Sequence, residues 1–340
     1  MGLPKEGSRI VLNFAILLLM VWTVGIFLVN IVLSDESVND DYIVAAKIVR
    51  QINNDPSDKI IIFGSSMGRE GLDQQYIQNQ LNGVKVYNLS VSSGKPSDFY
   101  LMLARIRLNN RIKLVVITLS PWIFQKKYTD DVISGNDVFT NLFFNPFKIG
   151  DIARFRELKS DWFIDSTISS FNPFYRYNSY FRKIIDQNQL SFWRRPSERS
   201  KATPWEQYAY RESKPESYFV DELGKDANYA EYKNDNFYWD AGKNIQITAL
   251  RKLTNELFKN NILTLAIDMP VNPYKEKLYD NGLIENYRAS IKLPLTGSKY
   301  HDFSFVYPKD NFIDFNHLNV SGRARFSQDI LVLISRDYGF

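Results

Sequence analysis

The sequence predicts an α/β fold built on a parallel sheet, with one transmembrane helix before it and an aromatic-rich insertion within it. Short, almost wholly apolar runs alternate with longer segments of helical spacing, which is typical of buried parallel strands and the helices that connect them. Residues 10–33 carry no charged side chain. Residues from about 125 to 240 interrupt the alternation with aromatic and turn residues. Together these observations define the expected organisation.

The uncharged segment over residues 10–33 is long enough to be a membrane anchor. A helix of that length extends about 36 Å, which exceeds the roughly 30 Å hydrocarbon core of a bilayer. A buried core helix is one alternative, but the segment has no polar face. A cleaved signal peptide is another, but the apolar stretch is longer than a typical signal core and no Ala-x-Ala-like site follows it.

Charges on the two sides of this segment predict its orientation. Lys5 and Arg9 precede it, whereas acidic residues follow it between positions 35 and 41. The positive-inside rule therefore keeps residues 1–9 in the cytoplasm and places residues 34–340 outside it. We expect a single-pass membrane protein with one extracytoplasmic domain.

In that domain, apolar runs predict strands at residues 59–63, 84–89, 114–119 and 262–267. Helical spacing predicts helices at residues 44–52, 72–81, 96–108, 245–258, 275–290 and 320–335. Gly64 closes the first strand, and Pro96 begins a helix at a position where its missing N–H is harmless. The alternation favours a parallel sheet with right-handed crossovers. The insertion at about 125–240 is expected to hold helical segments near residues 148–158 and 178–187.

Composition argues against several classes of function. A net charge of +4 over 340 residues gives little electrostatic support for nucleic-acid binding. The sequence has no cysteine, which excludes disulfides and a thiol nucleophile. With only two histidines and no EF-hand-like carboxylate spacing, a metal site is disfavoured, and no cofactor is implied.

Two motifs far apart in the sequence together predict acyl chemistry. Gly64-Ser65-Ser66 follows the first strand, and Asp314-Phe315-Asn316-His317 precedes the last helix. A hydroxyl nucleophile needs a general base, and the base needs an orienting carboxylate. His301, the other histidine, lies in a polar loop and is expected at the surface. Taken alone, the first motif is a common loop and the second is compatible with a helix cap.

Polar segments also follow the second and third predicted strands. Residues 88–94 end the second strand, where backbone N–H groups could face a developing oxyanion. Ser120-Pro121-Trp122-Ile123-Phe124 ends the third strand. Because open α/β sheets place their sites at the carboxyl ends of the strands, these segments are expected to converge with the serine motif.

With these motifs the chain resembles the SGNH/GDSL hydrolase superfamily, which implies a three-layer α/β/α fold. By this resemblance Ser66 is the nucleophile, with Ser65 the less favoured alternative, His317 the base and Asp314 its orienting partner. Ser90 stands at the oxyanion position of the second block, acting through its backbone N–H. The Gly-x-Asn-Asp of the third block is absent, and Ser120 at that strand end is a candidate donor instead.

The segment 120–124 and Pro270-Val271-Asn272 look like a membrane-anchored subgroup, the D-alanyl transfer proteins of teichoic-acid D-alanylation. The chain is also similar to the SGNH-like O-acetyltransferases of alginate and peptidoglycan. The resemblance implies a protein of the bacterial cell membrane that transfers or hydrolyses acetyl or D-alanyl esters of a cell-envelope polysaccharide or teichoic-acid-like polymer. It also implies a membrane-bound O-acyltransferase as partner.

Two interpretations of the aromatic residues remain open. Trp122, Tyr175, Tyr177, Trp193 and Trp205 are candidates for acceptor binding by stacking, whereas most aromatics in a chain of this composition are core residues or face a bilayer or a partner. A non-catalytic envelope protein of the same fold, with the insertion as a binding surface, is the alternative to an enzyme.

Overall fold

The structure, a computed structural model, describes part of the segment 9–24, residue 153, and residues 41–109, 111–128, 213–225, 231–280, 282–295 and 297–340. The chain divides into two compact units. One consists of Met1–Val44 and Asn136–Ser200, and the other of Ala45–Gly135 and Lys201–Phe340. All strands of the sheet belong to the second unit.

The predicted membrane anchor falls largely outside the described residues. Those described between positions 9 and 24 are helical, and their large apolar side chains are exposed. None of the helices in the described part of the chain combines the length and apolarity that a bilayer crossing requires. The anchor over residues 10–33 and the orientation inferred from its flanks stay predictions.

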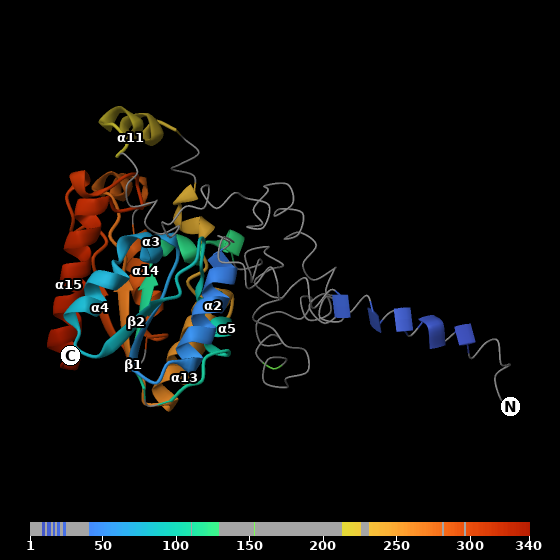
Figure 1. Ribbon diagram of the computed structural model, residues 1–340. Coiled ribbons are helices and arrows are strands. Elements are labelled where there is room, and N and C mark those ends of the chain that lie inside the picture. The colour runs from blue at the N-terminus through green and yellow to red at the C-terminus, as the bar shows by residue number, and fades with distance from the viewer. Residues whose placement is uncertain are drawn as a thin grey trace, which may run out of the picture. The chain divides into compact units, whose positions relative to one another are not determined.

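A five-stranded parallel sheet forms the centre of the second unit, which confirms the predicted α/β class (Figure 1). Its order is β2-β1-β3-β4-β5. The strands are β1 (Asp58–Phe63), β2 (Val84–Asn88), β3 (Ile112–Leu119), β4 (Leu263–Asp268) and β5 (Lys299–Asp302). In this order the connections that follow β1 and β3 leave toward opposite faces of the sheet, and open α/β sheets bind ligands in the crevice between them.

Helices cover both faces of the sheet and give three layers (Figure 1). One face carries α3 (Ser66–Gly71), α4 (Gln74–Gln80) and α15 (Val320–Tyr338). The other carries α2 (Asp41–Asn54), α5 (Pro96–Leu103) and α13 (Ile245–Lys259). Successive residues of a strand point to opposite faces. Ile62 accordingly packs with Ile330 of α15, while Phe63 stacks on Phe99 of α5 with ring centroids 5.8 Å apart.

Two predicted helices differ from the observed elements in their bounds. The helix expected at 72–81 is α4, which begins at Gln74 because Asp73 caps it by accepting a hydrogen bond from the Tyr76 amide at 2.9 Å. The helix expected at 275–290 is a 3₁₀ turn, η6 (Pro273–Leu278), followed by α14 (Leu283–Lys292). Gly282 separates them with φ of 78°, a left-handed conformation that favours glycine.

The fifth strand was not predicted, and α5 ends at Leu103 rather than at residue 108. Short elements complete the described chain, namely η1 (Pro121–Phe124), η2 (Lys126–Tyr128), α11 (Glu216–Leu223), η5 (Asn234–Asn236) and η7 (Lys309–Asn311). Apart from residue 153, which is helical, the helices expected near 148–158 and 178–187 lie outside the described residues.

A buried carboxyl group ends β4. Asp268 is 1% exposed, and its two oxygens accept hydrogen bonds from the hydroxyls of Tyr287 and Tyr300. Burial disfavours the charged form and raises the pKa of Asp268 to about 7, against an ordinary value near 3.8. The group therefore binds its proton more tightly in the folded protein than in the unfolded chain.

This difference predicts a stability that depends on pH. Because the folded pKa is the higher one, the stabilising contribution of Asp268 is complete below about pH 4 and is lost as the pH rises toward 7. Asp268→Asn, which keeps a neutral side chain of similar shape, is expected to flatten this loss. Urea unfolding of both proteins at pH 4.5 and 7.5 measures it, and a stability difference between them that does not change with pH would contradict the assignment.

Candidate active site

The candidate nucleophile lies directly after β1, where the chain turns into α3. Ser65 caps that helix, since its hydroxyl accepts a hydrogen bond from the Met67 amide, and Ser66 is the first helical residue. Gly64 and Gly68 let this turn pack closely on β3. A Cβ on Gly64 would lie 2.0 Å from Oγ1 of Thr118, and one on Gly68 would lie 2.4 Å from the same atom. Glycine is therefore required at both positions for Ser66 to stand where it does.

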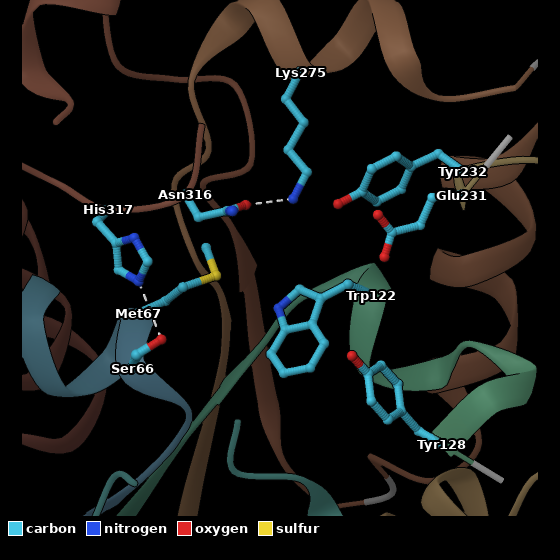
Figure 2. A pocket seen from close by; sticks show the side chains of 9 residues that line it. All are labelled: Ser66, Met67, Trp122, Tyr128, Glu231, Tyr232, Lys275, Asn316 and His317. Carbon is cyan, nitrogen blue, oxygen red and sulfur yellow. Dashed lines mark hydrogen bonds between the residues drawn. The ribbon is translucent and has the colours of Figure 1, made fainter. Parts of the chain in front are cut away.

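Ser66, His317 and Asp314 form a continuous chain of hydrogen bonds (Figure 2 shows its first link). Ser66 Oγ lies 3.1 Å from His317 Nε2. His317 Nδ1 lies 2.9 Å from Asp314 Oδ2 and 3.0 Å from Oδ1. An ionised carboxylate only accepts, so Nδ1 carries the proton and Nε2 of the neutral ring accepts from the serine. This is the tautomer that a general base for Ser66 needs.

The loop that carries Asp314 and His317 fixes their relative positions through its own backbone. Asp314 Oδ1 accepts from the amides of Asn316 at 2.7 Å and His317 at 2.9 Å. The Ile313 amide donates to the His317 carbonyl at 2.8 Å, which closes the loop. The candidate base and its orienting carboxylate are thus held in place within one short turn.

The pKa shifts of the pair agree with this geometry. Burial opposes ionisation of Asp314, but hydrogen bonds from the His317 ring and from backbone amides outweigh it and lower the pKa of the carboxyl. For His317, burial alone would lower the pKa, because it disfavours the charged imidazolium. The hydrogen bond and charge of Asp314, helped by the charge of Glu70, reverse this and raise the pKa above 6.5. The imidazole is consequently a stronger base than a free histidine.

A buried ion pair lies beside the outer edge of the imidazole. Glu70 Oε2 lies 3.9 Å from His317 Nε2, and Glu70 Oε1 lies 2.7 Å from Arg69. Arg69 also donates to Ser92 Oγ at 2.8 Å, and both charged side chains are almost fully buried. Sequence reasoning missed Glu70. The available signal was its spacing, since it follows Ser66 by four residues and thus lies on the same side of the helix.

Beside the serine lies a cavity of about 290 Å³. Its lining residues are Ser66, Met67, Trp122, Tyr128, Glu231, Tyr232, Lys275, Asn316 and His317 (Figure 2). Trp122, predicted as an acceptor-binding residue, stands edge-on to Tyr128 with centroids 5.5 Å apart. The other four aromatics proposed for this role, Tyr175, Tyr177, Trp193 and Trp205, lie outside the described residues.

Ser90 and Ser120, the two expected oxyanion donors, do not lie where that role requires. The Ser90 amide donates to Asn88 Oδ1 at 3.0 Å, and the Ser90 hydroxyl lies beneath Gly64 and Gly68. Ser120 is buried at the end of β3, and neither serine lines the cavity. As a correction to the expected role, the Ser90 N–H is occupied by a side-chain acceptor. Ser66 is the first residue of α3, so its own amide has no acceptor within that helix and is a candidate donor beside the nucleophile.

His301 occupies a separate position in β5. Its Nε2 lies 3.0 Å from Asp337 Oδ2, and the ring is partly exposed. Across the described residues, no cluster of three or more His, Asp or Glu side chains is arranged to hold a metal ion.

Comparisons with known proteins give distant likenesses only. No model of a protein family matches the chain, and no curated protein sequence matches it. A catalytic mutant of the acetylxylan esterase Axe2 from Geobacillus stearothermophilus is 14% identical, with 83% of this chain and 94% of that chain covered and a TM-score of 0.38.

The second similar structure is a family two carbohydrate esterase from Clostridium thermocellum in complex with cellohexaose. It is 11% identical, with 83% of this chain and 64% of that chain covered and a TM-score of 0.36. At TM-scores this low, neither likeness carries a conclusion about activity. Chemistry is therefore inferred from this chain's own residues.

The raised pKa of His317 predicts how the activity falls toward acidic pH. The base must be neutral, so kcat/KM for an ester is expected to rise with pH through an apparent pKa above 6.5. Asp314→Asn removes the carboxylate that fixes the tautomer and is expected to lower kcat by about 10³- to 10⁴-fold. A pH–rate profile of both proteins tests this. An Asp314→Asn enzyme with wild-type kcat would contradict the assigned role.

Glu70 and Arg69 provide a matched pair of variants with opposite expected effects. The negative charge of Glu70 raises the pKa of His317, and the positive charge of Arg69 lowers it. Glu70→Gln is thus expected to move the acid limb of kcat/KM to lower pH, and Arg69→Gln to move it to higher pH. Both variants lose the same buried ion pair and are destabilised alike. Shifts in the same direction would show that only stability, and no electrostatic effect on His317, is involved.

Proposed function

We propose that this protein is a serine-dependent O-acyl esterase or acyltransferase of the SGNH type that acts on a polymer of the cell envelope. The observation that carries the proposal is the hydrogen-bonded chain from Ser66 through His317 to Asp314 beside a cavity. A nucleophile, a base of suitable tautomer and an orienting carboxylate are the groups that acyl transfer through a serine ester requires.

In the first step, Ser66 Oγ attacks the carbonyl carbon of the donor ester while His317 Nε2 takes the hydroxyl proton. The negative charge on the carbonyl oxygen is met by backbone donors, of which the Ser66 amide at the start of α3 is one. Collapse of this intermediate breaks the bond to the donor alcohol, which leaves with the proton from His317. The acyl group remains as an ester on Ser66.

In the second step the acceptor hydroxyl attacks the acyl-serine. His317 takes the acceptor's proton and returns it to Ser66 Oγ as the ester breaks. With water as acceptor the reaction is hydrolysis, and with a polymer hydroxyl it is transfer. Trp122, Tyr128 and Tyr232 give the cavity aromatic surfaces against which the ring of a sugar can stack.

The setting of the reaction follows from the sequence. The predicted anchor over residues 10–33 would hold the domain at the outer surface of the bacterial cell membrane. Acetyl or D-alanyl groups are the proposed cargo, and a membrane-bound O-acyltransferase is the proposed donor partner. The missing asparagine of the third block and the occupied Ser90 amide favour the non-catalytic alternative. The hydrogen bonds that join Ser66, His317 and Asp314 favour the enzyme, because an unused serine needs neither the tautomer nor the loop that fixes it.

Substitution of the two adjacent serines tests the assignment of the nucleophile. Ser66→Ala is expected to abolish labelling by a fluorophosphonate probe and to lower hydrolysis of p-nitrophenyl acetate by at least about 10³-fold. Ser65→Ala removes only a helix cap, costing about 1 kcal/mol of stability, and is expected to keep labelling. Labelling lost in Ser65→Ala but kept in Ser66→Ala would reverse the assignment. A wild type that neither labels nor hydrolyses would favour the non-catalytic alternative.

A further inference from the structure

A lysine that the triad mechanism does not use stands in the same cavity. Lys275 is 1% exposed, yet its amino group points toward the middle of the cavity (Figure 2). Its hydrogen-bond acceptor is the neutral side-chain oxygen of Asn316. No carboxylate in the described part of the chain lies within ion-pair distance of Lys275. The carboxylates of Glu231 and Asp314 act on Lys275 only from beyond ion-pair distance, and burying a cation that is not directly paired is costly, so an anionic ligand is the partner that this position can take.

The nearest acidic side chain of the cavity is already engaged elsewhere. Glu231 Oε1 lies 2.6 Å from the amino group of Lys127, and the Glu231 carbonyl accepts a hydrogen bond from Gln125. This pairing directs the carboxylate of Glu231 toward Lys127. Lys275 instead contacts aromatic faces, with its amino group 5.0 Å from the ring centroid of Tyr232 and 5.8 Å from that of Tyr279.

A second hydrogen-bond donor is turned to the same point. Figure 2 shows the Tyr232 hydroxyl oriented toward the Lys275 amino group. Burial raises the pKa of Tyr232 well above its ordinary value, so the phenol keeps its proton. An ammonium and a phenolic O–H that face one small volume suit an oxyanion, because each donates and neither repels negative charge.

The backbone holds Lys275 rigidly and in register with the triad. Asn272 caps η6 by accepting from the Tyr274 amide at 3.1 Å, and its carbonyl accepts from the Lys275 amide at 2.8 Å. The Asn272 amide donates to the carbonyl of Phe315, within the loop of Asp314 and His317. The lysine is therefore built into the same frame as the catalytic base.

We infer that Lys275 and Tyr232 form a binding subsite for an anionic group, a carboxylate or a phosphate monoester or diester, carried by the acceptor alcohol. This rests on the proposed function and extends it. Neither acetyl nor D-alanyl carries a net negative charge, so the acyl group itself is not the anion. We assign the anion to the acceptor, whose charged group the subsite holds while a neighbouring hydroxyl reaches the acyl-serine.

Equilibrium binding tests the subsite without any need for turnover. Calorimetry compares lactate with lactamide, and glycerol 3-phosphate with glycerol, on the full chain. Wild type is expected to bind at least one anion about ten- to a hundredfold more tightly than its neutral counterpart. The carboxylate and phosphate arms tell which source is preferred. Equal affinity for anion and neutral compound in both arms overturns the inference, whether or not the protein hydrolyses esters.

Two substitutions test whether the preference for anions arises at Lys275. Lys275→Gln is expected to bring the ratio of anion to neutral affinity close to one. Lys277→Gln makes the same charge change on the exposed side of η6 and is expected to keep the wild-type ratio. Two results would contradict a specific site at Lys275. One is a ratio of anion to neutral affinity that Lys275→Gln leaves unchanged, and the other is a ratio that Lys277→Gln lowers as much as Lys275→Gln does.

If Lys275→Gln fails to fold, the pH dependence of wild-type binding replaces it. Burial lowers the pKa of Lys275 to about 8, against the opposing charges of Glu231 and Asp314. His317, Tyr232 and Tyr279 also face this region. The preference for the anion is expected to disappear as the pH rises through about 8, because the ammonium is lost. A preference that persists unchanged to pH 10 would contradict the role of the lysine.

Discussion

The hydrogen bond between Ser66 and His317 joins segments 251 residues apart, and the site depends on it. It requires the turn after β1 and the loop before α15 to reach the same edge of the sheet. The strand order provides this, because β1 lies inside the sheet between β2 and β3, and its carboxyl end opens at the crevice where the crossover connections diverge. Gly64 and Gly68 complete it by letting α3 approach β3 more closely than any side chain would permit.

The charges around the imidazole of His317 follow from the close approach of α3 to the loop before α15. Asp314 faces one nitrogen of the ring, and the carboxylate of Glu70 lies near the other. Both stabilise positive charge on the ring, which in the proposed mechanism His317 carries only while it holds the proton of Ser66. Arg69 neutralises Glu70 at the same time, so that a second carboxylate is tolerated in a buried position. The ion pair thus lets Glu70 act on the base without leaving a net charge in the core.

The sequence was sufficient for the sheet's centre and for the serine, histidine and aspartate, but not for their surroundings. Short apolar runs bounded by turn residues are typical of buried strands, so β1 to β4 were predicted within a few residues. The edge strand β5 (Lys-Tyr-His-Asp) has no such pattern, because an edge strand that is short and polar carries little burial signal. Glu70 and Lys275 were not predicted as part of the site, for a related reason. Charged residues are exposed by default, and only the fold reveals that these two are buried.

Ser90 illustrates a different gap between sequence and structure. Its position after β2 was predictable, whereas the partner of its amide was not, because Asn88 two residues earlier supplies a competing acceptor. Asparagines organise the site elsewhere too. The Asn272 side chain caps η6 and its backbone N–H donates to the Phe315 carbonyl, while the Asn316 side chain accepts from Lys275. His317 and the amino group of Lys275 are thus fixed to one another through two asparagines, so an anion bound at the proposed subsite would be positioned relative to the imidazole by the same hydrogen bonds.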